Sequence, residues 1–224
     1  MAVFEANPVA AAVALGAGAG LALVIYGLAE RPQASLLSVA AAAAVLVGYG
    51  ALGLTLNNLR SLADLRASSI AGLAAGVVFA AEILLEYIYL PPNNVVWGYG
   101  EFGIVFLIYA LVAAWVAWRG MTIGIAVRVA MVAAAISSLI WCLALLSTFY
   151  AYEGTSAQAA VLIAEGDPQD FLRSGMSDYR TFLIEDLFGA IFYHLLLGPI
   201  IAALLGLISS SPIVVLRRLR GRAD

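Results

Sequence analysis

The hydrophobic residues of this chain are collected in six long stretches with few or no charged side chains, separated by short polar segments. An α-helix rises about 1.5 Å per residue and the apolar core of a bilayer is about 30 Å thick, so roughly 20 consecutive apolar residues can cross a membrane. The stretches cover residues 8–28, 34–56, 70–90, 102–118, 122–150 and 183–208. The pattern predicts an all-α integral membrane protein, with about six transmembrane helices forming one compact bundle over residues 1–210.

Glycine and proline suggest how these helices pack. Gly16 and Gly20 in the first stretch, and Gly72 and Gly76 in the third, have the four-residue spacing of small side chains that lets helix backbones approach closely. Gly198-Pro199 lies in the sixth stretch, where the proline cannot donate to the carbonyl of residue 195. The sequence predicts a kink or a break at this point. Broken helices occur at transport sites, and plain kinks repaired by neighbouring helices are the alternative.

The segment from 153 to 180, between the fifth and sixth stretches, is long enough to carry structure of its own. Residues 155–164 have the pattern of a short amphipathic helix. Asp167 as N-cap, Pro168 in the first turn and Gly175 as a stop predict a second short helix. We expect this loop to fold over the mouth of the bundle, either as a simple cap or as part of a site. Residues 211–224 alternate apolar and basic side chains and predict an interfacial tail.

The arginines are distributed unevenly between the two sides of the predicted membrane. One side holds most of them, in the turns after the second and fourth stretches and in the tail: Arg60, Arg66, Arg119, Arg128, Arg217, Arg218, Arg220 and Arg222. The other side holds only Arg31, Arg173 and Arg180, together with most of the acidic residues. Because cytoplasmic loops retain positive charge, we expect both termini to be cytoplasmic in a cell (inner) membrane, with loop 153–180 outside.

Composition excludes several kinds of chemistry. All 11 basic residues are arginines, so no lysine is present for a Schiff base, a P-loop or general-base catalysis. With one cysteine, Cys142, and one histidine, a zinc site with the usual nitrogen and sulfur ligands cannot be built. The sequence identifies no cofactor and no metal. A net charge of −3 argues against nucleic-acid binding, so the partners we expect are the lipid bilayer and, in a complex, other membrane subunits or copies of this chain.

Ionisable side chains inside the stretches are the strongest candidates for a site, because a charge in the bilayer costs at least about 2.5 kcal/mol. Glu82 and Glu86 are four residues apart, so both carboxyls lie on one helix face. Asp186 and His194 lie in the sixth stretch. Counted from the helix ends, Glu82 and His194 have similar depths of roughly 10 to 12 Å, with Glu86 and Asp186 nearer the surface. We expect the third and sixth stretches to pack together and Glu82 to share a hydrogen bond or a water with His194.

The sequence leaves two interpretations of these residues open. The functional one is a cation or proton site that opens toward the acidic side of the membrane. The structural one is a set of hydrogen bonds between helices from neutral acids, with Arg173 or Arg180 folding in as a counter-charge.

In size, number of spans and alanine and glycine content, the chain resembles the substrate-binding membrane subunits of vitamin transporters, which implies a capture function by analogy of architecture. The features favour a small transporter, channel or substrate-capture subunit that uses the acidic site. The alternative is a non-catalytic structural subunit of a larger membrane complex. An intramembrane enzyme is less favoured, because one histidine without a nearby nucleophile or metal set gives little basis for a mechanism.

Overall fold

The computed structural model describes residues 7–56, 62–89 and 94–220, and within these ranges every regular element is an α-helix. The eight described helices are α1 (Pro8–Glu30), α2 (Leu36–Leu56), α3 (Leu62–Tyr89), α4 (Asn94–Trp118), α5 (Ile123–Ala151), α6 (Ser156–Glu165), α7 (Asp167–Ser174) and α8 (Tyr179–Arg220). Six of them are long and apolar enough to cross a membrane, and α6 and α7 are the short ones. The prediction of an all-helical protein with six helices that could span a membrane is therefore confirmed.

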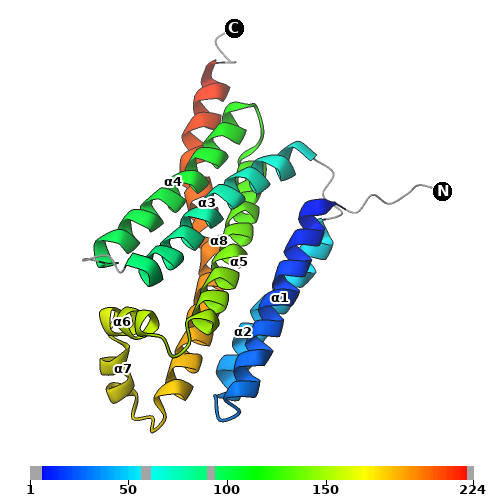
Figure 1. Cartoon of the computed structure of the whole chain (residues 1–224). Coiled ribbons are helices and arrows are strands. Elements are labelled where there is room, and N and C mark those ends of the chain that lie inside the picture. Colours follow the sequence, from blue (N-terminus) through cyan, green and yellow to red (C-terminus); the bar gives the residue numbers. More distant parts are fainter. Residues whose placement is uncertain (1–6, 57–61, 90–93, 221–224) are drawn as a thin grey trace, which may run out of the picture.

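The six long helices are organised around α5 and α8. Helices α1 and α2 pack against each other on one side, and α3 and α4 form a second pair on the other side (Figure 1). Helix α5 contacts both pairs and is the most buried of the six, which fits its run of small side chains from Ala133 to Ala135. Large apolar side chains on the outer faces, such as Leu15, Leu37 and Leu111, are exposed, as lipid-facing residues are.

The bundle has two distinct ends. Helices α6 and α7 lie at one end, below the ends of α3 and α4, whereas α1 begins and α8 finishes at the opposite end (Figure 1). We call these the α6–α7 end and the terminal end. The predicted sidedness, with the α6–α7 end outside, stays a prediction.

The predicted glycine contacts are present. A Cβ atom on Gly72 would lie 2.7 Å from the backbone carbonyl oxygen of Ala133, and one on Gly76 would lie 2.5 Å from Cδ1 of Ile140. These two positions let α3 lie directly against α5. Gly16 and Gly20 have the same role in α1, where added Cβ atoms would meet side chains of α5 and α2 at 2.8 and 3.0 Å.

Helix α8 runs through Gly198-Pro199 without interruption, so the proline does not break it. The carbonyl of Leu195, which Pro199 leaves without its helical donor, accepts a 2.7 Å hydrogen bond from the Tyr49 hydroxyl of α2. Helix α2 thus supplies the donor that the proline removes. Gly198 also lies against α5, since a Cβ there would come within 2.5 Å of Ser138 Oγ.

Three helices are longer than the apolar stretches indicated. Helix α3 begins at Leu62 rather than residue 70, and α4 begins at Asn94 rather than residue 102. Helix α8 continues to Arg220, so residues 211–220 are helical and continuous with the sixth long helix, and their interfacial position stays a prediction. Near its end, the Arg217 guanidinium donates a 3.0 Å hydrogen bond to the carbonyl oxygen of Ala117 and ties α8 to the end of α4. The sequence also suggests that Arg128 pairs with Asp64, but the side chain of Asp64 lies outside the described part of the chain.

The two short helices agree closely with their sequence signals. Thr155 caps α6, and Gly166 ends it with a φ of 94°, a backbone conformation that glycine adopts easily. Helix α7 ends at Gly175 as predicted, but Gly166 is its N-cap, so Asp167 is the first helical residue rather than the cap.

Candidate functional site: a membrane-embedded carboxyl cluster

Three glutamates from two spans meet near the α6–α7 end. Glu82 and Glu86 lie one turn apart on α3, and the carboxyl of Glu82 lies within hydrogen-bonding reach of both Glu86 and Glu101 of α4. Glu82 precedes the last described residue of α3 by seven positions, and Glu101 follows the first residue of α4 by the same number. At the helical rise, both are therefore about 10 Å inside their helix ends. We call Glu82, Glu86 and Glu101 the carboxyl cluster.

Glu101 is the most enclosed member of the cluster. Only 9% of the residue is exposed, and its Oε1 atom is buried without a hydrogen-bond partner in the described structure. A buried carboxyl oxygen without a donor is costly if the group is charged. The position therefore favours a bound proton, or a cation supplied from outside the chain.

A second group of acids lies between the cluster and the surface. Glu165 at the end of α6 interacts electrostatically with four other acids, Glu86, Asp167, Glu82 and Asp186. Helix α6 contacts α3, which brings Glu165 toward the cluster. We call Glu165, Asp167 and Asp186 the surface carboxyls. Together the two groups form a line of acids that leads from the α6–α7 end into the bundle.

The local environment changes the titration of the surface carboxyls that lie outside the spans. Glu165 keeps exposed surface, but partial burial, followed by repulsion from Glu86 and Asp167, raises the pKa of its carboxyl. Burial first, and then the charges of Asp186 and Asp170, raise the pKa of Asp167 to about 6. Both groups therefore hold their protons to higher pH than free carboxyls.

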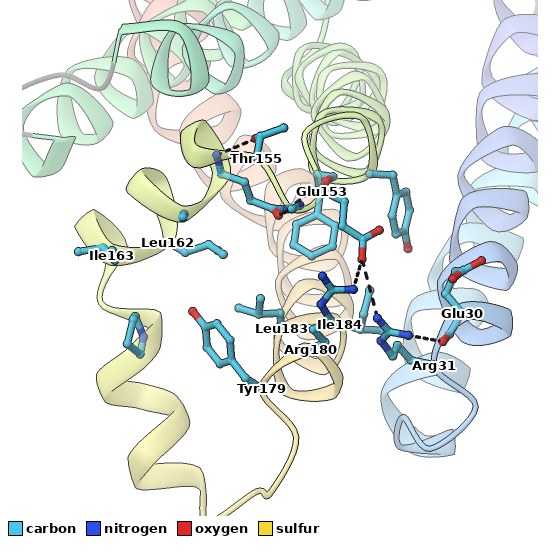
Figure 2. A pocket seen from close by; sticks show the side chains of 16 residues that line it. Glu30, Arg31, Glu153, Thr155, Leu162, Ile163, Tyr179, Arg180, Leu183 and Ile184 are labelled. Atoms are coloured by element: carbon cyan, nitrogen blue, oxygen red, sulfur yellow. Dashed lines mark hydrogen bonds and ion pairs between the residues drawn. The ribbon is translucent and has the colours of Figure 1, made fainter.

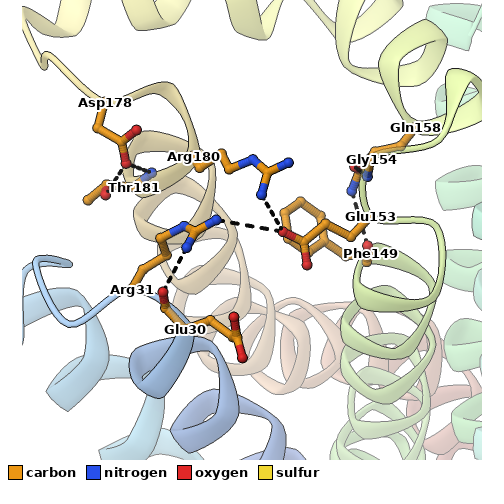
Figure 3. Close-up of polar contacts among 9 residues, drawn as sticks. All are labelled: Glu30, Arg31, Phe149, Glu153, Gly154, Gln158, Asp178, Arg180 and Thr181. Carbon is orange, nitrogen blue, oxygen red and sulfur yellow. Dashed lines mark hydrogen bonds and ion pairs between the residues drawn. The ribbon is translucent and has the colours of Figure 1, made fainter.

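The arginines at this end do not neutralise the acids of the line. Glu153 is in contact with two of them, 3.9 Å from Arg31 and 3.4 Å from Arg180, and Figure 3 shows both guanidinium groups directed at the same carboxylate oxygen. Arg173 pairs with Asp170 at 2.8 Å. The ion pairs of the described residues thus leave the carboxyl cluster and the surface carboxyls without an arginine, contrary to the counter-charge that the structural interpretation invoked.

The helix ends that support the line are fixed by local hydrogen bonds. Gln158 is buried, donates to the carbonyl of Phe149 and accepts from the backbone N–H of Gly154, both at 3.0 Å, and so anchors α6 to the end of α5 (Figure 3). Glu185 accepts a 2.8 Å hydrogen bond from the backbone N–H of Ser35, which ties the start of α2 to α8. Sequence inspection did not single out Gln158, because a lone glutamine in a loop carries no recognisable pattern.

A pocket of about 350 Å³ opens beside these ion pairs, between α1, α5, α6 and the start of α8 (Figure 2). Arg31, Glu153 and Arg180 line its polar side, and apolar side chains such as Leu162 and Leu183 line the rest. The carboxyl cluster does not line this pocket. Three of its four charged side chains, Arg31, Glu153 and Arg180, are already paired with one another, and the fourth is Glu30.

His194 occupies a different environment from the glutamates. Its ring stacks on Trp141 of α5, with centroids 3.8 Å apart and an angle of 7° between the planes. It also contacts Phe79, one turn before Glu82, at 5.0 Å, and Phe102, the neighbour of Glu101, at 6.3 Å. No direct hydrogen bond joins His194 to another described residue. His194 therefore lies close to the cluster but on its terminal-end side, within an aromatic group.

The predicted site residues are distributed over three positions. Glu82 and Glu86 lie together, Asp186 lies with the surface carboxyls, and His194 lies in the aromatic group. We expected α3 and α8 to pack against each other. Instead, α3 packs mainly on α5 and α4, and α8 packs mainly on α5, α4 and α2. Glu101 carries no signal of its own in the sequence, because it lies just before the apolar stretch that begins at residue 102.

The chemistry available to the cluster is proton sharing. Two carboxyl groups in contact inside a low-dielectric bundle repel each other strongly when both are charged. The arrangement of lowest free energy is therefore one proton shared between them. Among the described residues, no set of three or more histidine, cysteine, aspartate or glutamate side chains is arranged to hold a metal ion. Comparisons with protein-family models, curated proteins and solved structures found no match to this chain.

Proposed function

We propose that this protein is a small proton transporter whose carboxyl cluster takes up protons from the α6–α7 end. The observation that carries the proposal is the contact between Glu82 and Glu101 inside the bundle, with one buried Glu101 oxygen unpartnered and no arginine paired with the cluster in the described part of the chain. Acids placed in this way are expensive to keep in a membrane and are usually functional.

The line of acids supports entry from one side. The surface carboxyls lie at the α6–α7 end, and Glu165 interacts with both them and the cluster, so protons have carboxyl groups on which to move inward. The arginine asymmetry orients this end outward, because Arg119, Arg128 and Arg217 belong to the terminal end. Under this orientation, the outer solution supplies the protons.

Polar groups also continue beyond the cluster toward the terminal end. His194 lies about one turn further along, and Tyr109 of α4 and Ser137 of α5 share a 2.5 Å hydrogen bond between their hydroxyl groups. Ser138 adds a further hydroxyl beside them on α5. These side chains are candidates for the inner part of a proton path.

The test is proton uptake by proteoliposomes that contain a pH-sensitive dye, driven by a valinomycin-imposed potassium gradient. Replacement of Glu101 by glutamine keeps the shape of the side chain and should lower the uptake rate at least about tenfold, as loss of a residue on which protons move requires. Glu30→Gln is the matched control, because Glu30 is an acid at the same end outside the line, and it should behave like the wild type.

Uptake by wild-type vesicles no faster than by protein-free vesicles would overturn the proposal, and so would wild-type rates in Glu101→Gln. The first outcome would favour the structural-subunit alternative. Native mass and co-purifying chains of the detergent-extracted protein would then identify the complex. Equal thermal stability of the two variants ensures that lost uptake reflects the missing carboxyl.

A further inference from the structure

A second cavity lies in the membrane-spanning part of the bundle, between α3, α4, α5 and α8. Its volume is about 320 Å³, and its walls are largely aromatic, with Phe79, Phe102, Phe106 and Trp141 among the lining residues. An engineered cavity of about 150 Å³ holds benzene, so this one has room for a fused two- or three-ring molecule. Aromatic walls favour a flat guest, since rings gain energy from stacked and edge-to-face contacts.

Two polar side chains of this cavity, His194 and Ser138, lack hydrogen-bond partners among the described residues, whereas Tyr109 is bonded to Ser137. His194 lines the cavity and forms no hydrogen bond with a described residue. Ser138, at the floor beside Gly198, is fully buried, and its Oγ atom has no hydrogen-bond partner in the described structure. An unpaired donor at this depth cannot be satisfied by lipid chains, which offer no hydrogen-bonding atom.

The orientation of His194 is fixed before any ligand binds. Its face is covered by Trp141 at 3.8 Å, and Phe79 meets it from another direction at 5.0 Å with an angle of 74° between the planes. Because Trp141 covers a face of the imidazole ring, a bound molecule would contact the ring edge, which carries the nitrogen atoms. A histidine held in this way is preorganised to donate one hydrogen bond to an oxygen atom.

We propose that this cavity binds a planar, membrane-soluble ring system that carries a carbonyl or hydroxyl oxygen, with that oxygen hydrogen-bonded to His194. Quinone rings belong to this chemical class. An acyl chain of a lipid would fill the volume but leave His194 and Ser138 unpaired, so it fits the cavity less well. The inference concerns binding alone and does not depend on proton transport.

The experiment measures fluorescence quenching of the protein in lipid nanodiscs by 2-methyl-1,4-naphthoquinone. Trp141 is the tryptophan that lines the cavity, whereas Trp115 is half-exposed on the bundle surface. We expect saturable quenching in the wild type and in Trp115→Phe, and loss of the saturable part in Trp141→Phe. The hydrocarbon 2-methylnaphthalene, which has the same rings without oxygen, should compete at least about tenfold more weakly.

Two variants test the cavity itself. His194→Phe keeps the stacking ring and removes the hydrogen bond, and it should weaken quinone binding about 3- to 10-fold, the range for one such bond. Ala190 lies at an exposed position that lines the cavity, so Ala190→Leu should fill the cavity and remove saturable binding. This variant tests the proposal even if His194→Phe does not fold. Unchanged affinity in a folded variant, equal competition by the hydrocarbon, or unaltered quenching in Trp141→Phe would each overturn the proposal.

Discussion

Replacement of Gly72 by alanine should destabilise the bundle by forcing α3 away from α5. The new Cβ atom would lie 2.7 Å from the Ala133 carbonyl oxygen and 2.8 Å from Ile136 Cβ, both closer than such atoms approach in folded proteins. The first is a backbone atom of α5, so the clash cannot be relieved by a side-chain rotation. Helices α3 and α5 must separate by about half an ångström, and overpacking of this kind costs about 1–3 kcal/mol.

Two further glycines provide an internal scale for this prediction. At Gly76 the closest atom is the terminal Cδ1 of Ile140, which can move, and the nearest atom that cannot move by rotation is Ile140 Cβ at 2.9 Å, so Gly76→Ala should cost less than Gly72→Ala, whose fixed contacts are at 2.7 and 2.8 Å. At Gly48 of α2 a Cβ would meet nothing within 4 Å, and alanine there should be neutral or stabilising because it favours the helix. The general effect of alanine is common to all three variants, so their differences isolate the packing term.

The measurement is the free energy of unfolding in mixed micelles, obtained by titration with dodecyl sulfate and followed by tryptophan fluorescence. The expected order of stability is Gly48→Ala, then Gly76→Ala, then Gly72→Ala. If Gly72→Ala were as stable as Gly48→Ala, the close approach of α3 to α5 would be refuted, and the position of the carboxyl cluster on α3 would have to be reconsidered.

Three further predictions concern other parts of the chain. The raised pKa of Glu165 means that docking of α6 is favoured when this carboxyl is protonated and weakens as pH rises through that raised pKa. Hydrogen exchange in α6 should therefore be faster at pH 9 than at pH 5, beyond the intrinsic effect of pH on exchange, and a Glu165→Gln variant that kept the full difference would contradict this cause. Tyr49→Phe removes the donor to the Leu195 carbonyl and should lower the unfolding free energy by about 1 kcal/mol, whereas an unchanged value would show that the carbonyl has another partner. A membrane-impermeant thiol reagent applied to intact cells should label a cysteine at Ser156 and not one at Met121, in a background without Cys142, and the reverse pattern would invert the proposed orientation.

The fold was largely predictable because lipid imposes one strong condition on the sequence. Backbone groups inside the bilayer must be satisfied within a helix, so long uncharged stretches identify the spans. The same criterion predicted the first residues of α3 and α4 wrongly, because both helices begin in polar residues that precede the apolar stretch. Asn94 and Glu101 belong to α4 for this reason, although their polarity suggested a loop.

The site was predictable only in part. The spacing of Glu82 and Glu86 placed both carboxyls on one face of α3, because helical geometry alone decides that. Which helix faces them depends on side-chain packing across the bundle, and the sequence carries no local signal for it. Glu101, rather than His194, meets Glu82 since α4 lies beside α3, and the aromatic rings that enclose His194 come from α3, α4 and α5.

The central position of α5 has a consequence for the order in which the protein is assembled. The two helices of each pair, α1–α2 and α3–α4, contact each other, but the helices that pack against both pairs are α5 and α8, which follow them in the chain. During synthesis, the two helical hairpins must therefore remain in the membrane without the core that α5 begins and α8 completes. A ribosome stalled after α4 should leave these hairpins mobile relative to each other, with the Gly72 face of α3 open to lipid or to another chain.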